Sequence, residues 1–255
     1  MSTEPSSPMI RVATDTEATV AATAARIADI LTLAARQRGR ATMALAGGNT
    51  PRRLYEVLAG PPYATAIPWP AVHLFLGDER CVPPDHADSN QRMVRESLLA
   101  ALPEAPVFHP MPAEWTDLEA AAAEYARVLS REAPGPDAGL PQLDIALLGM
   151  GPDGHTASLF PGTPILDETR PVAAVHVPRL DAWRLSLTLP VFNATRHVLF
   201  LVTGAGKAEM LARILDEGPD SRWPASLVAP AAGEVEWHVD SEAAALLGDI
   251  RSRSR

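Results

Sequence analysis

The chain has 255 residues, of which 31 are acidic and 22 are basic, so its formal net charge at pH 7 is −9. A net negative charge repels nucleic acids and anionic lipids, which argues against both as partners. The single cysteine, Cys81, excludes an intramolecular disulfide and a cysteine-rich zinc site. Hydrophobic residues make up 47% of the chain, which is enough for a substantial core and too many for a disordered protein.

No uninterrupted apolar run reaches the roughly 20 residues that a membrane-spanning helix needs. Residues 1–8 are polar and lack the basic and apolar regions of a secretory signal peptide. Together with the single cysteine, these features predict a cytoplasmic protein without a membrane partner. We expect one domain over residues 1–255, with frayed tails at residues 1–8 and 249–255.

Short apolar segments alternate along the chain with segments of helical periodicity. The predicted strands are residues 10–13, 41–46, 72–76, 143–148, 172–177, 184–189, 198–202 and 235–239, and the predicted helices are residues 16–38, 51–58, 90–100, 117–131, 207–215 and 241–247. This alternation predicts an α/β fold, in which a mainly parallel sheet carries helices on both faces. Ligands of such sheets bind beyond the carboxyl ends of the strands, so the residues that follow each strand are the first candidates for a site.

The predicted strand at residues 41–46 is followed by Gly47, Gly48, Asn49 and Thr50, and then by a predicted helix. Glycines let the backbone approach an anion closely, and a helix N-terminus offers free N–H groups and the positive end of its dipole. The segment could therefore bind a phosphate or a sugar. The alternative is an ordinary turn in which Thr50 caps the helix, and the Gly-Lys-Ser/Thr ending of a Walker A loop is absent.

Three charged residues, Asp78, Glu79 and Arg80, follow the predicted strand at residues 72–76. They could form a solvated strand end, or they could place a carboxylate and a guanidinium group at the mouth of a cleft. Arginine suits a phosphate or a set of hydroxyl groups because its planar fork donates in two directions. Arg184, at the start of another predicted strand, presents the same choice between a surface charge and a substrate ligand.

Lys207 is the only lysine among the 22 basic residues, and it follows Gly204 and Gly206 in a turn that leads into a predicted helix. Arginine serves elsewhere in the chain, so a lone lysine could occupy a place that the larger planar group does not fit. There its ammonium group could contact a phosphate as a point charge. The alternative is that the lysine has survived by chance.

The longest glycine-rich segment follows the predicted strand at residues 143–148 and contains Asp153 and His155. A short helix expected next to His155 would place its imidazole at the positive end of the helix dipole, which favours the neutral form. A general base needs this neutral form near pH 7, and Asp153 could orient the ring. The alternative makes Asp153 a cap and His155 an ordinary turn residue.

The remaining histidines that we considered lack the spacing of metal ligands such as the His-Glu-x-x-His pattern. We therefore expect no metal site and no cofactor. The residues concerned are His73, His109, His176, His197 and His238.

Residues 149–161, with the sequence Gly-Met-Gly-Pro-Asp-Gly-His-Thr-Ala-Ser-Leu-Phe-Pro, resemble the signature of 6-phosphogluconolactonases. Supporting matches occur in the family order at residues 47–51, 77–80, 88–90, 185–188, 203–204 and 207. The resemblance implies a three-layer, Rossmann-like fold shared with glucosamine-6-phosphate deaminases and ribose-5-phosphate isomerases. It implies hydrolysis of 6-phospho-D-glucono-1,5-lactone to 6-phosphogluconate in the pentose phosphate pathway. The partner would be this small phosphorylated lactone, and we expect a monomer or a small homo-oligomer.

By motif match, the resemblance makes His155 the general base and places Asp78 where the related deaminases keep an essential carboxylate. Asp153 is the third catalytic candidate, on account of its proximity to His155. The candidates for binding the phosphorylated substrate are Gly47, Gly48, Asn49, Thr50, Arg80, Arg184 and Lys207.

Two other functions stay open. An amino-sugar phosphate deaminase would share the fold, but those enzymes usually follow Asp-Gly-His with a hydrophobic residue and an Asn-Glu-Pro segment, whereas residues 156–160 here are Thr-Ala-Ser-Leu-Phe. A non-catalytic sugar-phosphate sensor would keep the phosphate cradle but would have no need of a base such as His155. Ammonia release from glucosamine 6-phosphate and acid release from fresh lactone would separate these functions.

Overall fold

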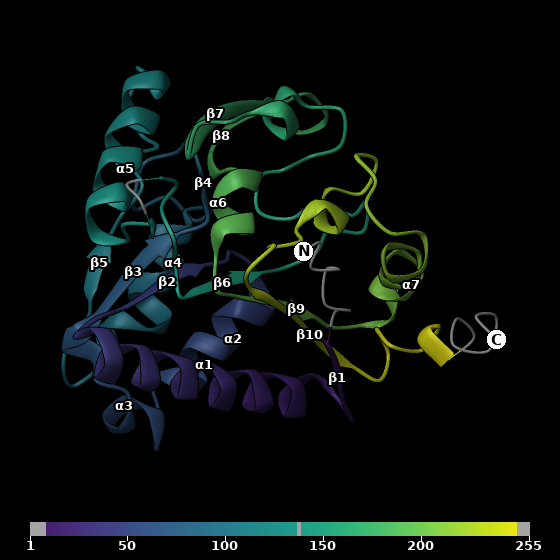
Figure 1. Cartoon of the computed structure of the whole chain (residues 1–255), viewed down its shortest axis with the longest axis horizontal. Coiled ribbons are helices and arrows are strands. Elements are labelled where there is room, and N and C mark those ends of the chain that lie inside the picture. The colour runs from purple at the N-terminus through teal and green to yellow at the C-terminus, as the bar shows by residue number, and fades with distance from the viewer. Residues whose placement is uncertain (1–8, 137–138, 249–255) are drawn as a thin grey trace.

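A seven-stranded sheet forms the centre of the fold in a computed structural model that describes residues 9–136 and 139–248 (Figure 1). The strand order is β1-β10-β9-β6-β2-β3-β5, and every neighbouring pair is parallel. The predicted tails at residues 1–8 and 249–255 lie outside the described residues. The strands are β1 (Met9–Ala13), β2 (Ala41–Leu45), β3 (Val72–Leu76), β5 (Val107–His109), β6 (Ile145–Leu148), β9 (His197–Val202) and β10 (Glu234–Asp240).

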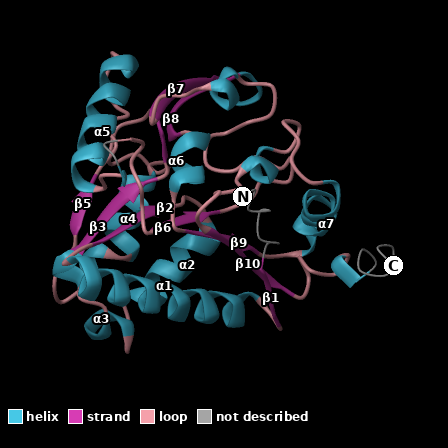
Figure 2. Ribbon diagram, viewed as in Figure 1, coloured by secondary structure: helices cyan, strands magenta, loops and turns pink. Residues whose placement is uncertain are grey.

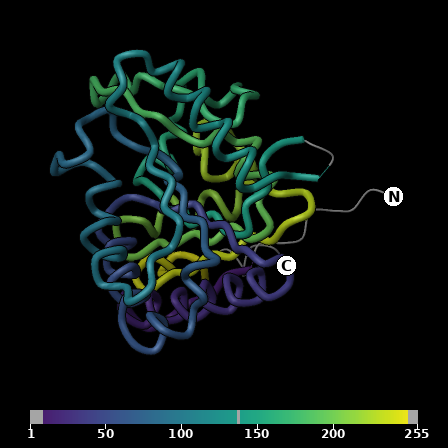
Figure 3. Tube along the Cα trace, turned by 90° about the vertical axis from the view of Figure 1, so that its left-hand side faces the viewer, coloured from purple at the N-terminus to yellow at the C-terminus, as the bar shows by residue number. Residues whose placement is uncertain are grey.

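Helices cover both faces of this sheet, as the sequence predicts (Figure 2). The α-helices are α1 (Thr16–Arg38), α2 (Asn49–Leu58), α3 (Tyr63–Ala66), α4 (Asn90–Ser97), α5 (Leu118–Glu132), α6 (Leu189–Ala194) and α7 (Ala208–Glu217). Short 3-10 helices are η1 (Trp69–Ala71), η2 (Leu99–Ala101), η4 (Pro164–Asp167), η5 (Pro178–Leu180), η6 (Ala205–Lys207) and η7 (Pro224–Leu227). Figures 1 and 3 both place α1 (purple) below the sheet, on the side opposite α6 and α7 in Figure 1.

A second, three-stranded sheet lies above the large one in Figure 1, with the antiparallel order β4-β8-β7. It contains β4 (Asp78–Arg80), β7 (Val172–Val177) and β8 (Ala182–Leu187). The sequence predicts the last two as strands of a single, mainly parallel sheet, and it does not predict that they form a separate antiparallel one. Only η5 and Asp181 separate them, and such a short connection suits a hairpin, because parallel strands need a crossover of a dozen or more residues.

Several predicted boundaries shift in the structure, and two strands were not predicted at all. Strands β4 and β5 have only three residues each, too few to show an alternating pattern. Helix α2 begins at Asn49 rather than at Pro51, and the strand predicted at 184–189 runs from Ala182 to Leu187. The helix predicted at residues 241–247 is wrong over residues 241–246, which form turns.

Helix α1 shows how the sequence sets an element and its packing. The Asp15 side chain accepts from the Ala18 N–H at the start of the helix, and Gly39 ends it in the left-handed conformation (φ 73°). By length and mean hydropathy this helix could span a membrane. The search for uninterrupted apolar runs in the sequence did not detect it. In the structure its Val20, Ile27 and Leu31 are fully buried, as in a helix that packs on a sheet.

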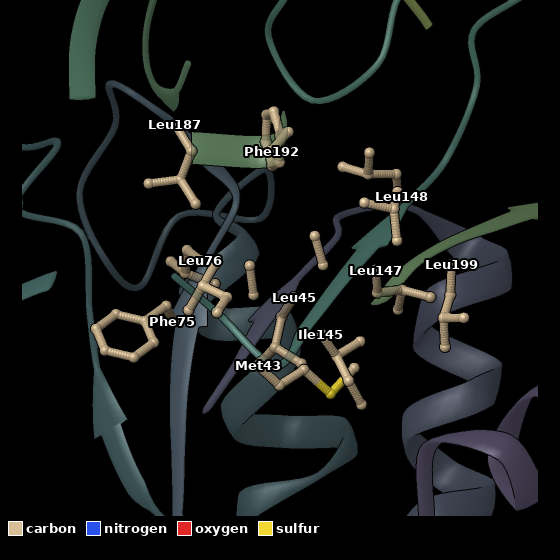
Figure 4. Close-up of a cluster of buried hydrophobic side chains, with 14 of the residues drawn as sticks. Met43, Leu45, Phe75, Leu76, Ile145, Leu147, Leu148, Leu187, Phe192 and Leu199 are labelled. Atoms are coloured by element: carbon tan, nitrogen blue, oxygen red, sulfur yellow. The ribbon is translucent and has the colours of Figure 1, made fainter. Parts of the chain in front are cut away.

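One apolar core joins the two sheets (Figure 4). Leu187 of β8 and Phe192 of α6 lie above the side chains of the central strands, and both are fully buried. The Leu187 N–H also donates to the Gly77 carbonyl oxygen (2.8 Å), at the point where β3 leaves the large sheet. The small sheet is thereby fixed over the carboxyl ends of the central strands. The labelled core side chains from the large sheet are Met43, Leu45, Phe75, Leu76, Ile145, Leu147, Leu148 and Leu199.

Candidate active site

A cavity of about 400 Å³ opens where the carboxyl ends of β2, β3 and β6 meet the small sheet. Its walls include backbone from the glycine-rich segments that follow β2 and β6. Both sheets contribute its charged side chains, so predicted site residues from distant parts of the sequence come together here. The charged or titratable residues of the lining are Asp78, Arg80, His155, Arg179, Arg184 and Lys207.

His155 is held from two sides. Its Nδ1 lies 2.5 Å from Oδ1 of Asp153, and its ring stacks on Phe160 with the ring centroids 4.2 Å apart. A carboxylate only accepts hydrogen bonds, so this contact assigns the proton of the neutral ring to Nδ1. The lone pair then lies on Nε2, where a general base needs it.

The helix dipole predicted as the cause of a neutral His155 is absent, so that prediction is wrong. No helix follows this residue: Ala157 has a positive φ of 46°, residues 156–159 form a turn closed by a bridge, and the next helical turn begins only at Pro164. Burial is what lowers the pKa of His155, and the charge of Arg179 lowers it further, while the hydrogen bond and charge of Asp153 oppose them. The imidazole is therefore neutral near pH 7.

The loop around His155 needs a glycine at position 151. A Cβ atom there would overlap the imidazole ring of His155 and approach Oδ1 of Asp153. The Gly151 N–H donates to the His155 carbonyl oxygen (2.8 Å), and the Gly154 N–H donates to the Gly151 carbonyl oxygen (3.1 Å). The loop thus folds tightly over its own histidine, and these two N–H groups are used within it.

Asp78 is a buried residue of the cavity lining and is hydrogen-bonded to the His155 loop. Ser158 Oγ donates to Asp78 Oδ2 (2.6 Å), and Asn90 Nδ2 donates to the Asp78 carbonyl oxygen (2.9 Å). Asn90 also lines the cavity, and a side chain at Gly47 would overlap it. Asp78 therefore ties together the segments that follow β3 and β6.

Glu79, next to Asp78, has a structural role at the start of α4. Its buried carboxylate accepts from the backbone N–H groups of Asn90 (2.8 Å) and Gln91 (2.7 Å) and from Ser89 Oγ (3.0 Å). Burial raises its pKa, whereas these backbone hydrogen bonds lower it. Glu79 thus anchors the start of α4 and does not line the cavity. These hydrogen bonds explain why the charged motif at 78–80 and the motif at 88–90 occur together.

Arg80 and Arg184 lie directly opposite each other on the antiparallel strands β4 and β8. Like charges in such a pair repel unless something between them compensates. The Nε atoms of both side chains are buried and have no hydrogen-bond partner within the described part of the chain. Arg80 does use one Nη atom, which donates to the Asp88 carbonyl oxygen. The pair thus offers buried, unused donors to an electron-rich group.

Only part of the phosphate-binding segment predicted at residues 47–50 lines the cavity. Gly47 and Gly48 line the cavity, but Asn49 and Thr50 do not. Thr50 does not cap the helix either: Gly48 is the N-cap of α2, and Thr50 Oγ1 lies 3.1 Å from Thr203 Oγ1. The uncapped start of α2 leaves first-turn N–H groups free, as an anion site requires.

Lys207 lies at the N-cap of α7 and lines the same cavity as His155. Burial lowers the pKa of its ammonium group, and the negative charge of Asp153 opposes that shift. The hydrogen bond between Thr50 and Thr203 joins the turn before α7 to the start of α2. The two helix starts therefore approach one another at this end of the cavity.

The chain is similar to known proteins over most of its length. Residues 14–237 match the family described as glucosamine-6-phosphate isomerases/6-phosphogluconolactonase. The chain is 43% identical over 217 residues to the 6-phosphogluconolactonase of Synechocystis sp., a match that covers 84% of this chain and 87% of the relative. It is 41% identical over 218 residues to the 6-phosphogluconolactonase of Homo sapiens, with 82% of each chain covered. The chain belongs to the 6-phosphogluconolactonase family.

Solved structures agree with this membership. The structure of 6-phosphogluconolactonase from Trypanosoma brucei matches with a TM-score of 0.84 and 31% identity, covering 94% of this chain and 98% of that one. A monomeric glucosamine-6-phosphate deaminase, at 20% identity and a TM-score of 0.78, shares the fold alone. The predicted resemblance to the 6-phosphogluconolactonase family and the predicted fold are therefore confirmed.

The cavity lining of this 6-phosphogluconolactonase family member also includes Asn90 and Arg179, which were not among the predicted site residues. Asn90 could have been found, since it belongs to the motif at residues 88–90. Arg179 carries no motif and comes from the turn between β7 and β8. Of the predicted residues, Gly47, Gly48, Asp78, Arg80, His155, Arg184 and Lys207 line the cavity, while Asn49, Thr50 and Asp153 do not.

A group that could hold a metal ion lies away from this cavity. Ligand atoms of His197, Glu234 and Glu236 are within 4.8 Å of one another, an arrangement that sequence spacing could not reveal. His197 begins β9 and Glu234 begins β10, so the group is at the amino ends of the strands. Both carboxylate oxygens of Glu236 already pair with arginines, Arg11 and Arg26, each at 2.6 Å. These guanidinium groups already compensate the carboxylate charge of Glu236 that would attract a cation.

A larger groove, of about 1250 Å³, adjoins the cavity and shares Arg80 and Arg184 with it. It is lined by no histidine among the residues that the structure describes. Cys81 lies there, and burial raises the pKa of its thiol to about 11. The thiol is thus protonated at neutral pH, and the smaller cavity that contains His155 is the candidate active site.

Proposed function

We propose that this chain hydrolyses 6-phospho-D-glucono-1,5-lactone to 6-phosphogluconate, with His155 as the general base. The observation that carries the proposal is the imidazole of His155, held at Nδ1 by Asp153, in a cavity that also contains Lys207. Membership of the 6-phosphogluconolactonase family supports the choice of a lactone hydrolase.

The proton movements can be assigned to one side chain. Nε2 of His155 takes a proton from water, and the resulting hydroxide oxygen bonds to C1 of the lactone, which becomes a tetrahedral oxyanion. When this intermediate collapses, the bond between C1 and the ring oxygen breaks. The protonated His155 then gives its proton to the departing ring oxygen, and the imidazole is neutral again for the next turnover.

The oxyanion needs donors that are free before the reaction begins. The N–H groups of Gly151 and Gly154 already donate within the His155 loop, so they are poor candidates. Arg80 and Arg184 have buried Nε atoms without partners and are better ones. A substrate oxygen between them would also relieve their mutual repulsion.

The phosphate belongs at the other group of donors in the cavity. Lys207 supplies a positive charge there, and the uncapped N-terminus of α2 at Gly48 supplies backbone N–H groups. A helix N-terminus stabilises an anion through its free N–H groups and its dipole. Asn49 and Thr50 then contribute through their backbone and through the Thr50–Thr203 contact rather than by lining the cavity with side chains.

Asp153 and Asp78 have separate supporting roles in this scheme. Asp153 keeps the proton of the imidazole on Nδ1 through the 2.5 Å contact. Asp78 fixes the loop that carries His155, because it accepts from Ser158 Oγ. Both carboxylates also favour the imidazolium form that arises when His155 has taken a proton, since their charges raise its pKa.

The test is an assay of the purified chain on freshly prepared phosphorylated lactone, with and without a chelator. We expect acid release well above the spontaneous rate, equal in the two conditions, and no ammonia from glucosamine 6-phosphate. Loss of activity with the chelator would contradict the metal-independent mechanism. Ammonia release without acid release would show a deaminase, and neither product would show a binding protein.

The pH dependence of kcat/KM should have an acid limb below pH 6.5. His155 must be neutral to act as a base, and burial lowers its pKa from the ordinary value of 6.5. Activity should therefore be level near pH 7 and fall as acidity protonates the ring. Rates measured from pH 5 to 7.5, after subtraction of the spontaneous reaction, check this. A limb centred above pH 6.5 would contradict the assignment.

A further inference from the structure

Arg179 lies at the tip of the hairpin that joins β7 to β8. It is the middle residue of η5, and the chain reverses after it at Asp181, which has a positive φ of 44°. The tip reaches over the cavity, so Arg179 and Leu180 contribute to its lining. The small sheet thus supplies a cation close to the catalytic loop of the large sheet.

The contacts of Arg179 are with the partners of His155. Nη1 of Arg179 lies 2.5 Å from Oδ2 of Asp153, and its guanidinium carbon lies 4.8 Å from the centre of the Phe160 ring. Phe160 is the same ring on which His155 stacks. Asp153 Oδ2 is buried and accepts no hydrogen bond from the residues described, so the ion pair with Arg179 compensates its charge.

Two groups compete for Nδ1 of His155. Asp153 Oδ1 is 2.5 Å away and can only accept, whereas Nη2 of Arg179 is 3.4 Å away and can only donate. The carboxylate is much closer, so Nδ1 keeps its proton and faces Asp153. If Asp153 turned away, Arg179 would favour the opposite tautomer, with the lone pair on Nδ1 and the proton on Nε2.

We propose that Arg179 is a positioning residue for the general base, which holds Asp153 on Nδ1 of His155 so that Nε2 keeps its lone pair toward the substrate. This inference rests on the proposed lactonase function. Arg179 acts through Asp153 and Phe160 and does not itself exchange protons with the substrate. The ion pair fixes one carboxylate oxygen, which leaves the other aimed at the imidazole.

The test compares Arg179→Met and Arg179→Lys with a matched control, Arg170→Met. Arg170 is a half-exposed arginine just before β7 that pairs with Glu168 and Glu119 outside the cavity. Loss of positioning should lower kcat of Arg179→Met by about 5- to 50-fold, with KM changed less than about threefold. Arg179→Lys keeps the charge but cannot stack as a planar group, so it should recover part of kcat. Arg170→Met should match the parent chain.

A double-mutant cycle shows whether Arg179 acts through Asp153. In an Asp153→Asn background, Arg179→Met should cost little further kcat, because the ion pair is already lost. Two full, multiplicative losses would overturn the proposal. A rise in KM for the phosphorylated lactone alone would also overturn it, since Arg179 would then be a phosphate ligand.

Nitrogen NMR of His155 gives a readout that does not depend on turnover. The parent chain should show a proton on Nδ1 and none on Nε2, and Arg179→Met should shift the population toward the other tautomer. An unchanged tautomer together with unchanged kcat would overturn the role of Arg179. Absence of lactone hydrolysis by the parent chain would instead refute the proposed function, and the NMR comparison would still decide the pairing.

Discussion

Replacing His155 with glutamine is expected to lower kcat by roughly 10²- to 10⁴-fold, the usual range for loss of a general base. Glutamine keeps a polar side chain of similar length at the position next to Asp153, but it cannot take a proton from water. The fold should survive, because His155 belongs to a loop at the cavity and not to the core. Initial rates of acid release at saturating lactone measure the effect, and circular dichroism checks the fold.

His197→Gln is the matched control for this variant. His197 is also part-buried, lies beside a carboxylate at 3.3 Å from Glu234, and has a pKa lowered by burial, but it begins β9 at the far end of the sheet. Its replacement should leave kcat within about twofold of the parent value. Near-normal turnover by a folded His155→Gln variant would remove His155 from the mechanism.

Replacing Lys207 with alanine should raise KM for the phosphorylated lactone by roughly 10- to 100-fold, since a hydrogen bond to a charged group contributes about 1.5–3 kcal/mol. KM for unphosphorylated gluconolactone should change little, because that substrate has no phosphate to lose contact with. The ratio of the two effects is the measurement. It separates loss of a phosphate contact from general damage to the cavity.

Arg213→Ala is the control on the same helix. Arg213 lies on α7 six residues after Lys207, pairs with Glu209 at its surface, and does not line the cavity. It should leave both KM values unchanged. Equal rises for the two lactones in Lys207→Ala would argue that the lysine supports the cavity without contacting phosphate.

Most strands of the large sheet could be predicted from the sequence because they are short, mainly apolar segments between helical segments, whereas the three-residue β5 was missed. The run at residues 72–76, for example, becomes β3 with the same bounds. The small sheet could not be predicted in the same way. Its β4 has three charged residues, Asp78 to Arg80, and a pattern of charges carries no signal for a strand.

The sequence predicted correctly that the site lies at the carboxyl edge of the sheet, but it did not predict which side chains contact one another there. Residues that follow the strands at a sheet's carboxyl edge must lie near one another, which is why His155 and Lys207 share a cavity. The contact of Arg179 with Asp153 depends on how a hairpin of the other sheet folds over that edge. No spacing in the sequence indicates that Arg179 and Asp153 meet, so this contact is seen only in the folded structure.

The neutral form of His155 was predicted for the wrong reason. The sequence predicts a helix dipole beside His155, but Ala157 adopts a left-handed conformation that a continuous right-handed helix does not allow. Burial in the cavity produces the same direction of pKa shift. The two causes differ in practice, because the effect of burial depends on the surrounding walls, including Phe160 and the hairpin tip.

The shared apolar contact between the sheets also limits which mutations the chain can accept. Leu187 and Phe192 do not line the cavity, but both are fully buried against the central strands, and Leu187 belongs to the same strand as Arg184. A smaller side chain at either position is expected to lower stability and to change how the small sheet packs on the central strands, and with it the position of Arg184. Substitutions at this apolar contact between the two sheets can thus lower turnover although neither residue lines the cavity.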